Sequence, residues 1–318
     1  MKRLLLSVGV ALLLTAGTVW AGPFEDATAA YKRGDYATAL KTFQSLATQG
    51  NAMAQFNLGI LYEKERGVPQ DYAKAREWYE KSAAQGNAEA QYNLGVFYNR
   101  GYGVPQDFAE ARQWYEKAVA QGLAEAQFNL GVMYDNGQGI PQDYAMARRW
   151  YEKAAVQNNA EAQYNLGTLY YFGRGVPQNY AKAREWYERA AAQGLAQTQY
   201  NLGVMYDNGW GVSQDYKKAR QWYEKAAVQN DARAQSNLGV LYEKGQGVPQ
   251  DYKKARQWYE QAAAQGNAGA QYNLGALYAN GWGVSQDYKK ARQWWEKAAA
   301  QGDAAAQHNL GVLVKLGE

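Results

Sequence analysis

The stretch Ala-Gln-Phe-Asn-Leu-Gly, residues 54–59, decides the fold, because it returns along the chain in close variants. Its asparagine stands at 57, 93, 129, 165, 201, 237, 273 and 309, always 36 residues apart. A period between about 20 and 50 residues, held without insertion, is typical of solenoids, whose units bury their apolar faces only by stacking on one another. The sequence therefore predicts an all-α solenoid, with its function on an extended surface.

The second half of each unit has the spacing of an amphipathic helix, which we call helix B. In residues 71–86 the apolar side chains fall at i, i+3, i+7 and i+11, one stripe of a helix with 3.6 residues per turn. These side chains are Tyr72, Ala75, Tyr79 and Ala83. The stripe predicts one buried face.

The first half predicts a second helix, helix A, over residues 52–64. Ala54, Leu58 and Leu61 form its apolar stripe. Gly59 lies within it and returns in every later unit, although a glycine inside a helix costs about 1 kcal/mol relative to alanine. We therefore expect a packing role for this glycine, in which two helices approach closely.

The connections between the helices have their own signals. Helix B is followed by Gly at 50, 86, 122, 194, 266 and 302 and by Asn at 158 and 230, the residue types that most readily adopt the left-handed conformation ending a helix. Gly-x-Gly-Val-Pro-Gln-Asp, as in residues 101–107, joins A to B and predicts a tight turn followed by a helix start. This loop lacks the Lys-Ser/Thr of a nucleotide-binding loop.

The sequence resembles the Sel-one-like repeat, a longer-loop relative of the tetratricopeptide repeat. Ala-Gln-Tyr-Asn-Leu-Gly, Gly-x-Gly-Val-Pro-Gln-Asp-Tyr, Ala-Arg-x-Trp-Tyr and Ala-Ala-x-Gln-Gly carry the resemblance, from about Asp35 to the C-terminus. It implies a right-handed α-solenoid of antiparallel helix pairs that acts as an adaptor for protein complexes and is often exported in bacteria. A cysteine-rich branch is proposed to bind or cleave β-lactams, and by analogy to it a protein that binds or hydrolyses cell-wall ligands or β-lactams is the alternative function, although this chain has no cysteine.

The first 21 residues lie outside the repeats. Lys2 and Arg3 precede an apolar stretch that ends at Val19-Trp20-Ala21, as a secretory signal peptide requires, and cleavage is expected after Ala21. An uncleaved anchor is the alternative, but the apolar run is shorter than the roughly 20 residues that span a membrane. The expected product is periplasmic or secreted, without membrane insertion after cleavage.

The expected organisation follows from these boundaries. Residues 1–21 form the signal peptide, 22–50 a degenerate capping helix pair, 51–302 seven repeats and 303–318 a single capping helix. Atypical terminal units are usual in such arrays.

Net charge and composition exclude several classes of function. Without Lys2 and Arg3 the chain has 32 basic and 30 acidic residues, so its net charge falls from +4 to +2, whereas nucleic-acid binders have a strongly basic face. His308 is the only histidine, and neither a cysteine nor a carboxylate cluster accompanies it. We interpret it as a variant of an aromatic position, with a general base or ligand as the alternative. We therefore expect no nucleic acid, cofactor or metal, and no catalysis.

The positions that vary between repeats give the binding hypothesis. Placed on the inner face that the resemblance implies, they form an aromatic ladder suited to protein or peptide contact. The candidate partner-contact residues are Phe56, Tyr92, Phe128, Tyr164, Tyr171, Phe172, Tyr200 and Tyr272. The alternative is that these rings only pack repeat against repeat. The recurring asparagine likewise either binds a peptide backbone or ties helix A to its neighbour. The sequence specifies neither the partner nor an oligomeric state.

Overall fold

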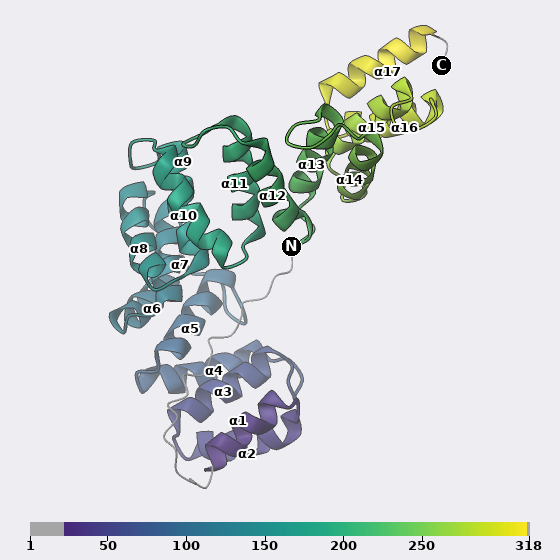
Figure 1. Cartoon of the computed structure of the whole chain (residues 1–318). Helices are drawn as coiled ribbons and strands as arrows, with labels where there is room; N and C mark the ends of the chain where they lie inside the picture. Colours follow the sequence, from purple (N-terminus) through teal and green to yellow (C-terminus); the bar gives the residue numbers. More distant parts are fainter. Residues whose placement is uncertain (1–21, 317–318) are drawn as a thin grey trace. The chain divides into compact units, whose positions relative to one another are not determined.

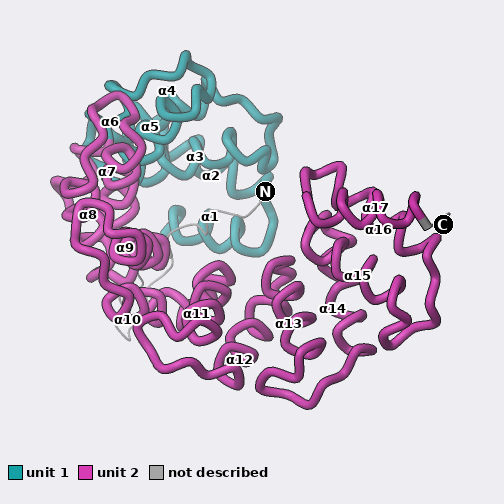
Figure 2. Tube along the Cα trace, turned by 90° about the horizontal axis from the view of Figure 1, so that it is seen from above, with its two compact units in different colours: residues 1–114 teal, residues 115–318 magenta. Residues whose placement is uncertain are grey.

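The computed structural model describes residues 22–316, and in this part of the chain all regular structure is helical, with 17 helices and no strand. Consecutive helices pair antiparallel with the 36-residue period, so the predicted α-solenoid is confirmed (Figure 1). The expected signal peptide lies outside the described residues. The chain divides into two compact units, residues 1–114 and 115–318, with the division inside α6 (Figure 2).

The odd-numbered helices are the A-helices and the even-numbered ones the B-helices. The A-helices are α1 (Pro23–Lys32), α3 (Ala52–Glu63), α5 (Ala88–Arg100), α7 (Ala124–Asn136), α9 (Ala160–Phe172), α11 (Ala196–Asn208), α13 (Ala232–Lys244), α15 (Ala268–Asn280) and α17 (Ala304–Leu316). The B-helices are α2 (Tyr36–Thr48), α4 (Tyr72–Ala84), α6 (Phe108–Ala120), α8 (Tyr144–Val156), α10 (Tyr180–Ala192), α12 (Tyr216–Ala227), α14 (Tyr252–Ala264) and α16 (Tyr288–Ala299).

The helix ends form as their residues predict. Asp71 accepts a hydrogen bond from the Lys74 backbone N–H at 3.0 Å and so caps the start of α4. The glycines and asparagines expected to end the B-helices have positive φ, for example +87° at Gly86 and +67° at Asn158. These helix ends are therefore set by residues that are close to them in the sequence.

The repeated glycine of helix A makes room for an aromatic ring. A Cβ added to Gly203 would lie 2.4 Å from the ring of Tyr223, which comes from the paired B-helix and is fully buried. The same tyrosine lies over the equivalent glycine in α3, α7, α9 and α13, and Trp295 takes its place over Gly275. The close approach expected at these glycines is thus made mainly by a ring, and at Gly311 in α17 no such ring is present within 4 Å.

Two glutamines bind each other within each repeat, and the first of them also bonds the preceding unit. Gln85, at the end of α4, donates from Nε2 to Oε1 of Gln55 at 2.8 Å, and Gln55 donates to the carbonyl of Ala47. The same glutamine pairs occur at 127 and 157, 163 and 193, 199 and 229, 235 and 265, and 271 and 301. Because the first glutamine of each pair is buried, the pair satisfies polar groups that would otherwise destabilise the fold.

The Gly-x-Gly loops also join one unit to the next. A Cβ at Gly211 would lie 2.6 Å from the backbone of Tyr180, the first residue of the preceding B-helix. The middle residue of the loop, Trp210, stacks on the Tyr180 ring with centroids 5.8 Å apart. The loop glycines therefore have a packing function and a positive φ, +69° at Gly211, that favours glycine.

Within the second unit the A-helices follow the inner side of a curve. Figure 2 shows α11 and α13 on this side and α10 and α12 on the outer side. Successive A-helices contact each other, α11 with α13 and α13 with α15. In the described part of the chain no helix has the length and apolar character needed to cross a membrane.

Candidate functional site

The predicted partner-contact residues all belong to A-helices. Phe56 and Tyr92 lie in the first unit, and Phe128, Tyr164, Tyr171, Phe172, Tyr200 and Tyr272 lie in the second. All are half-buried except Phe172, which is 57% exposed. A half-buried ring is compatible both with packing between repeats and with partner contact, because one side packs inward while another remains accessible.

The inward contacts of these rings repeat from unit to unit. The ring of Tyr164 lies 5.8 Å, centroid to centroid, from the buried Tyr187 of its paired B-helix. The equivalent pairs are Phe56 with Tyr79 at 5.8 Å, Phe128 with Tyr151 at 5.9 Å and Tyr200 with Tyr223 at 6.0 Å. Each ring thus stabilises its own helix pair, and the exposed side remains a candidate contact surface.

Tyr171 and Phe172 have different environments. Tyr171 packs among rings, 5.2 Å from Tyr180 and 5.8 Å from Trp210, the tryptophan of the following loop. Phe172 contacts Tyr171 at 4.8 Å, and the Arg174 guanidinium lies 5.1 Å from its ring centroid. Tyr171 therefore has a clear packing function, whereas Phe172 is the accessible ring of the two.

A carboxylate at the end of several A-helices accepts a hydrogen bond from the buried tyrosine. In the second unit the Tyr151 hydroxyl donates to Asp135 at 3.0 Å, and the Tyr223 hydroxyl donates to Asp207 at 3.0 Å. Tyr79 with Glu63 and Tyr259 with Glu243 repeat the arrangement, each at 2.6 Å. Burial raises the pKa of these tyrosines, so they remain neutral hydroxyl donors.

The recurring asparagine belongs to the same network. The Asn165 side chain lies close enough to the Tyr151 hydroxyl to influence its pKa, and Asn237 is placed likewise for Tyr223, in each case from the following A-helix. This contact lowers the pKa of the tyrosine, although burial has the larger and opposite effect. The structural interpretation of the asparagine ladder therefore has a specific partner, the tyrosine of the preceding unit.

Asp207 repeats the carboxylate position of Asp135, whereas Arg233 departs from the repeat pattern. Burial raises the pKa of Asp207, because desolvation outweighs the hydrogen bond from Tyr223 and the charge of Lys244. The guanidinium of Arg233, at the start of α13, lies 4.2 Å from the ring centroid of Tyr200 and forms a 2.7 Å ion pair with Asp231. Arg233 thus forms a cation–π contact with Tyr200, one of the ladder rings.

Catalytic groups are sparse in the described part of the chain. His308 is exposed in α17, the last helix of the described residues. No group of three or more His, Asp or Glu side chains within residues 22–316 is placed to hold a metal ion. Within the described residues, His308 therefore has no cluster of metal-ligating side chains around it.

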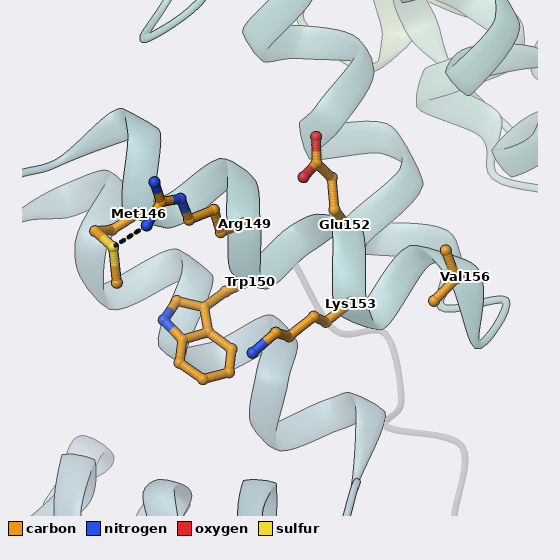
Figure 3. A pocket seen from close by; sticks show the side chains of 6 residues that line it. All are labelled: Met146, Arg149, Trp150, Glu152, Lys153 and Val156. Carbon is orange, nitrogen blue, oxygen red and sulfur yellow. Dashed lines mark hydrogen bonds between the residues drawn. The ribbon is translucent and has the colours of Figure 1, made fainter.

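A hollow of about 490 Å³ opens on the surface of α8 (Figure 3). The six residues that line it are Met146, Arg149, Trp150, Glu152, Lys153 and Val156, all from this one helix. The Lys153 ammonium lies 4.2 Å from the Trp150 ring centroid, and Arg149 contacts the Met146 sulfur. Because its lining comes from a single B-helix, the hollow is a weaker candidate than the inner face, which several helices build.

The Sel1 repeat model matches residues 52–87, 88–123, 124–159, 160–195, 196–231, 232–267 and 268–303. The chain belongs to the Sel1 repeat family. Sel1 repeat proteins are generally protein-interaction scaffolds and typically non-catalytic, so the family assignment supports the predicted binding function in this general form. It gives no support to a β-lactam hydrolase. A search of the curated proteins found no match.

Two solved structures of Sel1 repeat proteins are similar to this one over 93% of the chain. The first is c5321, described as a protective antigen of uropathogenic Escherichia coli with an SLR fold, at 40% identity and a TM-score of 0.86. The chain spans 65% of the length of that protein. The second is a Sel1 repeat protein from Oxalobacter formigenes, at 34% identity and a TM-score of 0.69, with 91% of that chain covered. Both relatives confirm the solenoid.

The sequence did not reveal the hydrogen bonds that lie behind the ladder rings. The tyrosines that bind the carboxylates were expected only as packing residues, and the glutamine pairs were not expected at all, although both glutamines recur in the units. Arg233 had a signal of its own, since the equivalent position holds Met53, Glu89, Glu125, Glu161, Gln197 and Gly269 in the other repeats.

Proposed function

We propose that this Sel1 repeat protein is an exported, non-catalytic scaffold that binds a protein or peptide partner along the inner face of its A-helices. One observation carries the proposal: half-buried rings, each fixed from behind by a buried tyrosine, recur on successive A-helices with one side accessible. Rigid aromatic side chains contribute contact area at a low cost in conformational entropy. The general scaffold function of Sel1 repeat proteins agrees with this.

Export rests on the first 21 residues, which have the basic start, apolar stretch and small residues of a cleavable signal peptide. Expression of the full chain in a Gram-negative host, followed by fractionation and N-terminal sequencing, tests this step. We expect the soluble periplasmic or secreted protein to begin at Gly22. A protein that keeps Met1 and remains in the membrane fraction would support the anchor instead.

The binding step is tested by capture from a periplasmic extract of the source organism, with mass spectrometry of the retained proteins. Phe172→Ala removes the most accessible ring of the face, and truncation of a central contact costs about 2 kcal/mol, roughly thirtyfold in affinity. Val228→Ala is the matched control, because Val228 is 82% exposed and follows the B-helix α12. We expect Phe172→Ala to weaken capture and Val228→Ala to leave it unchanged.

The double variant Tyr171→Ala with Phe172→Ala is a stricter test of the same face. Because Tyr171 packs against Tyr180 and Trp210, this variant needs a parallel thermal melt by circular dichroism. Weakened capture together with an unchanged melting temperature supports the inner face. Unchanged capture by Phe172→Ala and by the double variant would place the partner on another surface.

A further inference from the structure

Charge is segregated between the two kinds of helix in the second unit. The A-helices α7, α9 and α11 contain four carboxylates, Glu125, Asp135, Glu161 and Asp207, and no lysine or arginine. Their paired B-helices α8, α10 and α12 each contain more basic than acidic residues. An acidic inner face on a chain of net charge +4 is therefore a local property that the overall composition does not explain.

The carboxylates and the rings occupy the same face. On α7, Asp135 stands seven residues after Phe128, and on α11 Asp207 stands seven residues after Tyr200, two helical turns along one side. The buried tyrosine behind each carboxylate holds one oxygen, Oδ2 in both cases, and no basic residue of α7, α9 or α11 neutralises the charge. Desolvation raises the pKa of Asp207 and outweighs both the hydrogen bond from Tyr223 and the charge of Lys244 in α13, so the protein compensates this charge only in part.

Arg233 shows how a cation fits this face. Its guanidinium lies over the Tyr200 ring at the edge of the acidic region, 4.2 Å from the ring centroid, and it pairs with Asp231. The equivalent positions beside the preceding rings hold Glu161 next to Phe128 and Gln197 next to Tyr164, so those rings have no such cation from the chain. A cation over an aromatic face, with a carboxylate nearby, gains from both interactions.

We propose that the inner face of α7, α9 and α11 binds a basic, extended segment of a partner protein, whose arginine or lysine side chains lie over the ladder rings beside Asp135 and Asp207. This inference rests on the proposed scaffold function and names its partner class. Arg233 occupies the ring at one end of the face, so it competes with the partner there. The partner segment is basic, and not acidic or purely apolar, because the inner face of α7, α9 and α11 combines carboxylates with aromatic rings.

The probe is a fluorescein-labelled peptide with three copies of Arg-Gly-Leu-Ser, and its controls contain citrulline or glutamate in place of arginine. Citrulline has nearly the shape of arginine without its charge. We expect fluorescence anisotropy to show binding of the arginine peptide at least tenfold tighter than of either control at low salt, weakening as NaCl is raised because the contacts are partly exposed. Equal binding of the arginine and citrulline peptides overturns the inference.

Three variants test whether the arginine peptide binds to this face. Asp207→Asn keeps an acceptor for Tyr223 and should weaken the arginine peptide about fivefold, the upper end expected for one exposed ion pair. Glu224→Gln is the matched control, because it changes the net charge equally on the B-helix α12, and no effect is expected. Arg233→Gln, which copies Gln197 of the preceding repeat, should tighten binding at least twofold. An effect of Glu224→Gln as large as that of Asp207→Asn contradicts the inference, as does unchanged or weaker binding to Arg233→Gln.

The outcome is separable from that of the proposed function. If Phe172→Ala abolishes capture of the natural partner while arginine and citrulline peptides bind alike, the scaffold proposal stands and the basic partner class is wrong. If Phe172→Ala and the double variant leave capture unchanged and the arginine peptide has no preference over its controls, both proposals fail.

Discussion

Replacing Gly203 by alanine tests the packing rule that holds each helix pair together. The added Cβ would lie 2.4 Å from two carbon atoms of the Tyr223 ring, well inside van der Waals contact. That ring is fully buried, and its hydroxyl is bound to Asp207 at 3.0 Å, so it has little freedom to move away. Gly311→Ala is the matched control, because the equivalent Cβ in α17 meets nothing within 4 Å.

Two opposing effects determine the expected magnitude. Alanine in place of glycine favours a helix by about 1 kcal/mol, and this gain applies at both positions. Overpacking a well-packed core costs about 1–3 kcal/mol, and the fixed Tyr223 ring places Gly203→Ala at the upper end of that range. We therefore expect Gly203→Ala to lower the free energy of unfolding by about 2 kcal/mol, since the clash exceeds the helical gain. Gly311→Ala should leave stability unchanged or raise it.

Urea denaturation followed by circular dichroism measures both variants, and a double-mutant cycle identifies the cause. In a Tyr223→Leu background the ring is absent, so Gly203→Ala should then cost far less than in the wild-type protein. If Gly203→Ala is as harmless as Gly311→Ala, or if its cost persists after Tyr223→Leu, the ring does not explain the repeated glycine.

Three further predictions follow from the repeat and its network. Deleting one whole unit, residues 196–231, should leave a shorter folded solenoid, whereas deleting 196–213 should not; equal loss of helix and cooperativity by circular dichroism would contradict the repeat argument. The raised pKa of Asp207 means that its contribution to stability is present at acidic pH and is lost as the pH rises through the folded-state pKa. Asp207→Asn should therefore raise the melting temperature more at pH 7 than at pH 3, and an equal shift at both pH values would contradict this. The purified protein should hydrolyse neither a chromogenic β-lactam nor peptidoglycan above blank; activity lost in His308→Ala would establish catalysis.

The sequence predicted the helices accurately because their signals are local. The Asp71 cap, the Gly86 end and the apolar stripe of each helix act within a few residues, and the 36-residue period repeats them. Which ring lies over which glycine is a long-range fact, since Gly203 and Tyr223 belong to different helices. The period shows that both residues matter but not that they touch each other.

The candidate site was predictable only in part for the same reason. The ladder positions follow from the alignment that the family resemblance implies, and the structure places these residues on A-helices. How much of each ring remains accessible depends on the loop of the next repeat. Trp210 of that loop covers Tyr171, while Phe172 remains exposed. Helical spacing does not show which of these two consecutive aromatic residues the next unit covers, whereas the packing does.

The structure also indicates why only a few positions of each repeat are available to determine which partner binds. In a typical unit the glutamine, the glycine and the B-helix tyrosine each have a fixed contact inside the array, so substitution there would affect stability before binding. Two positions take no part in these recurring contacts: the second residue of the A-helix, which Arg233 occupies in α13, and the last, which Phe172 occupies in α9. These are also positions at which the repeats differ in charge and size. Under the proposed scaffold function, a solenoid of this kind would acquire a new partner by changing one of these residues per repeat without disturbing its core.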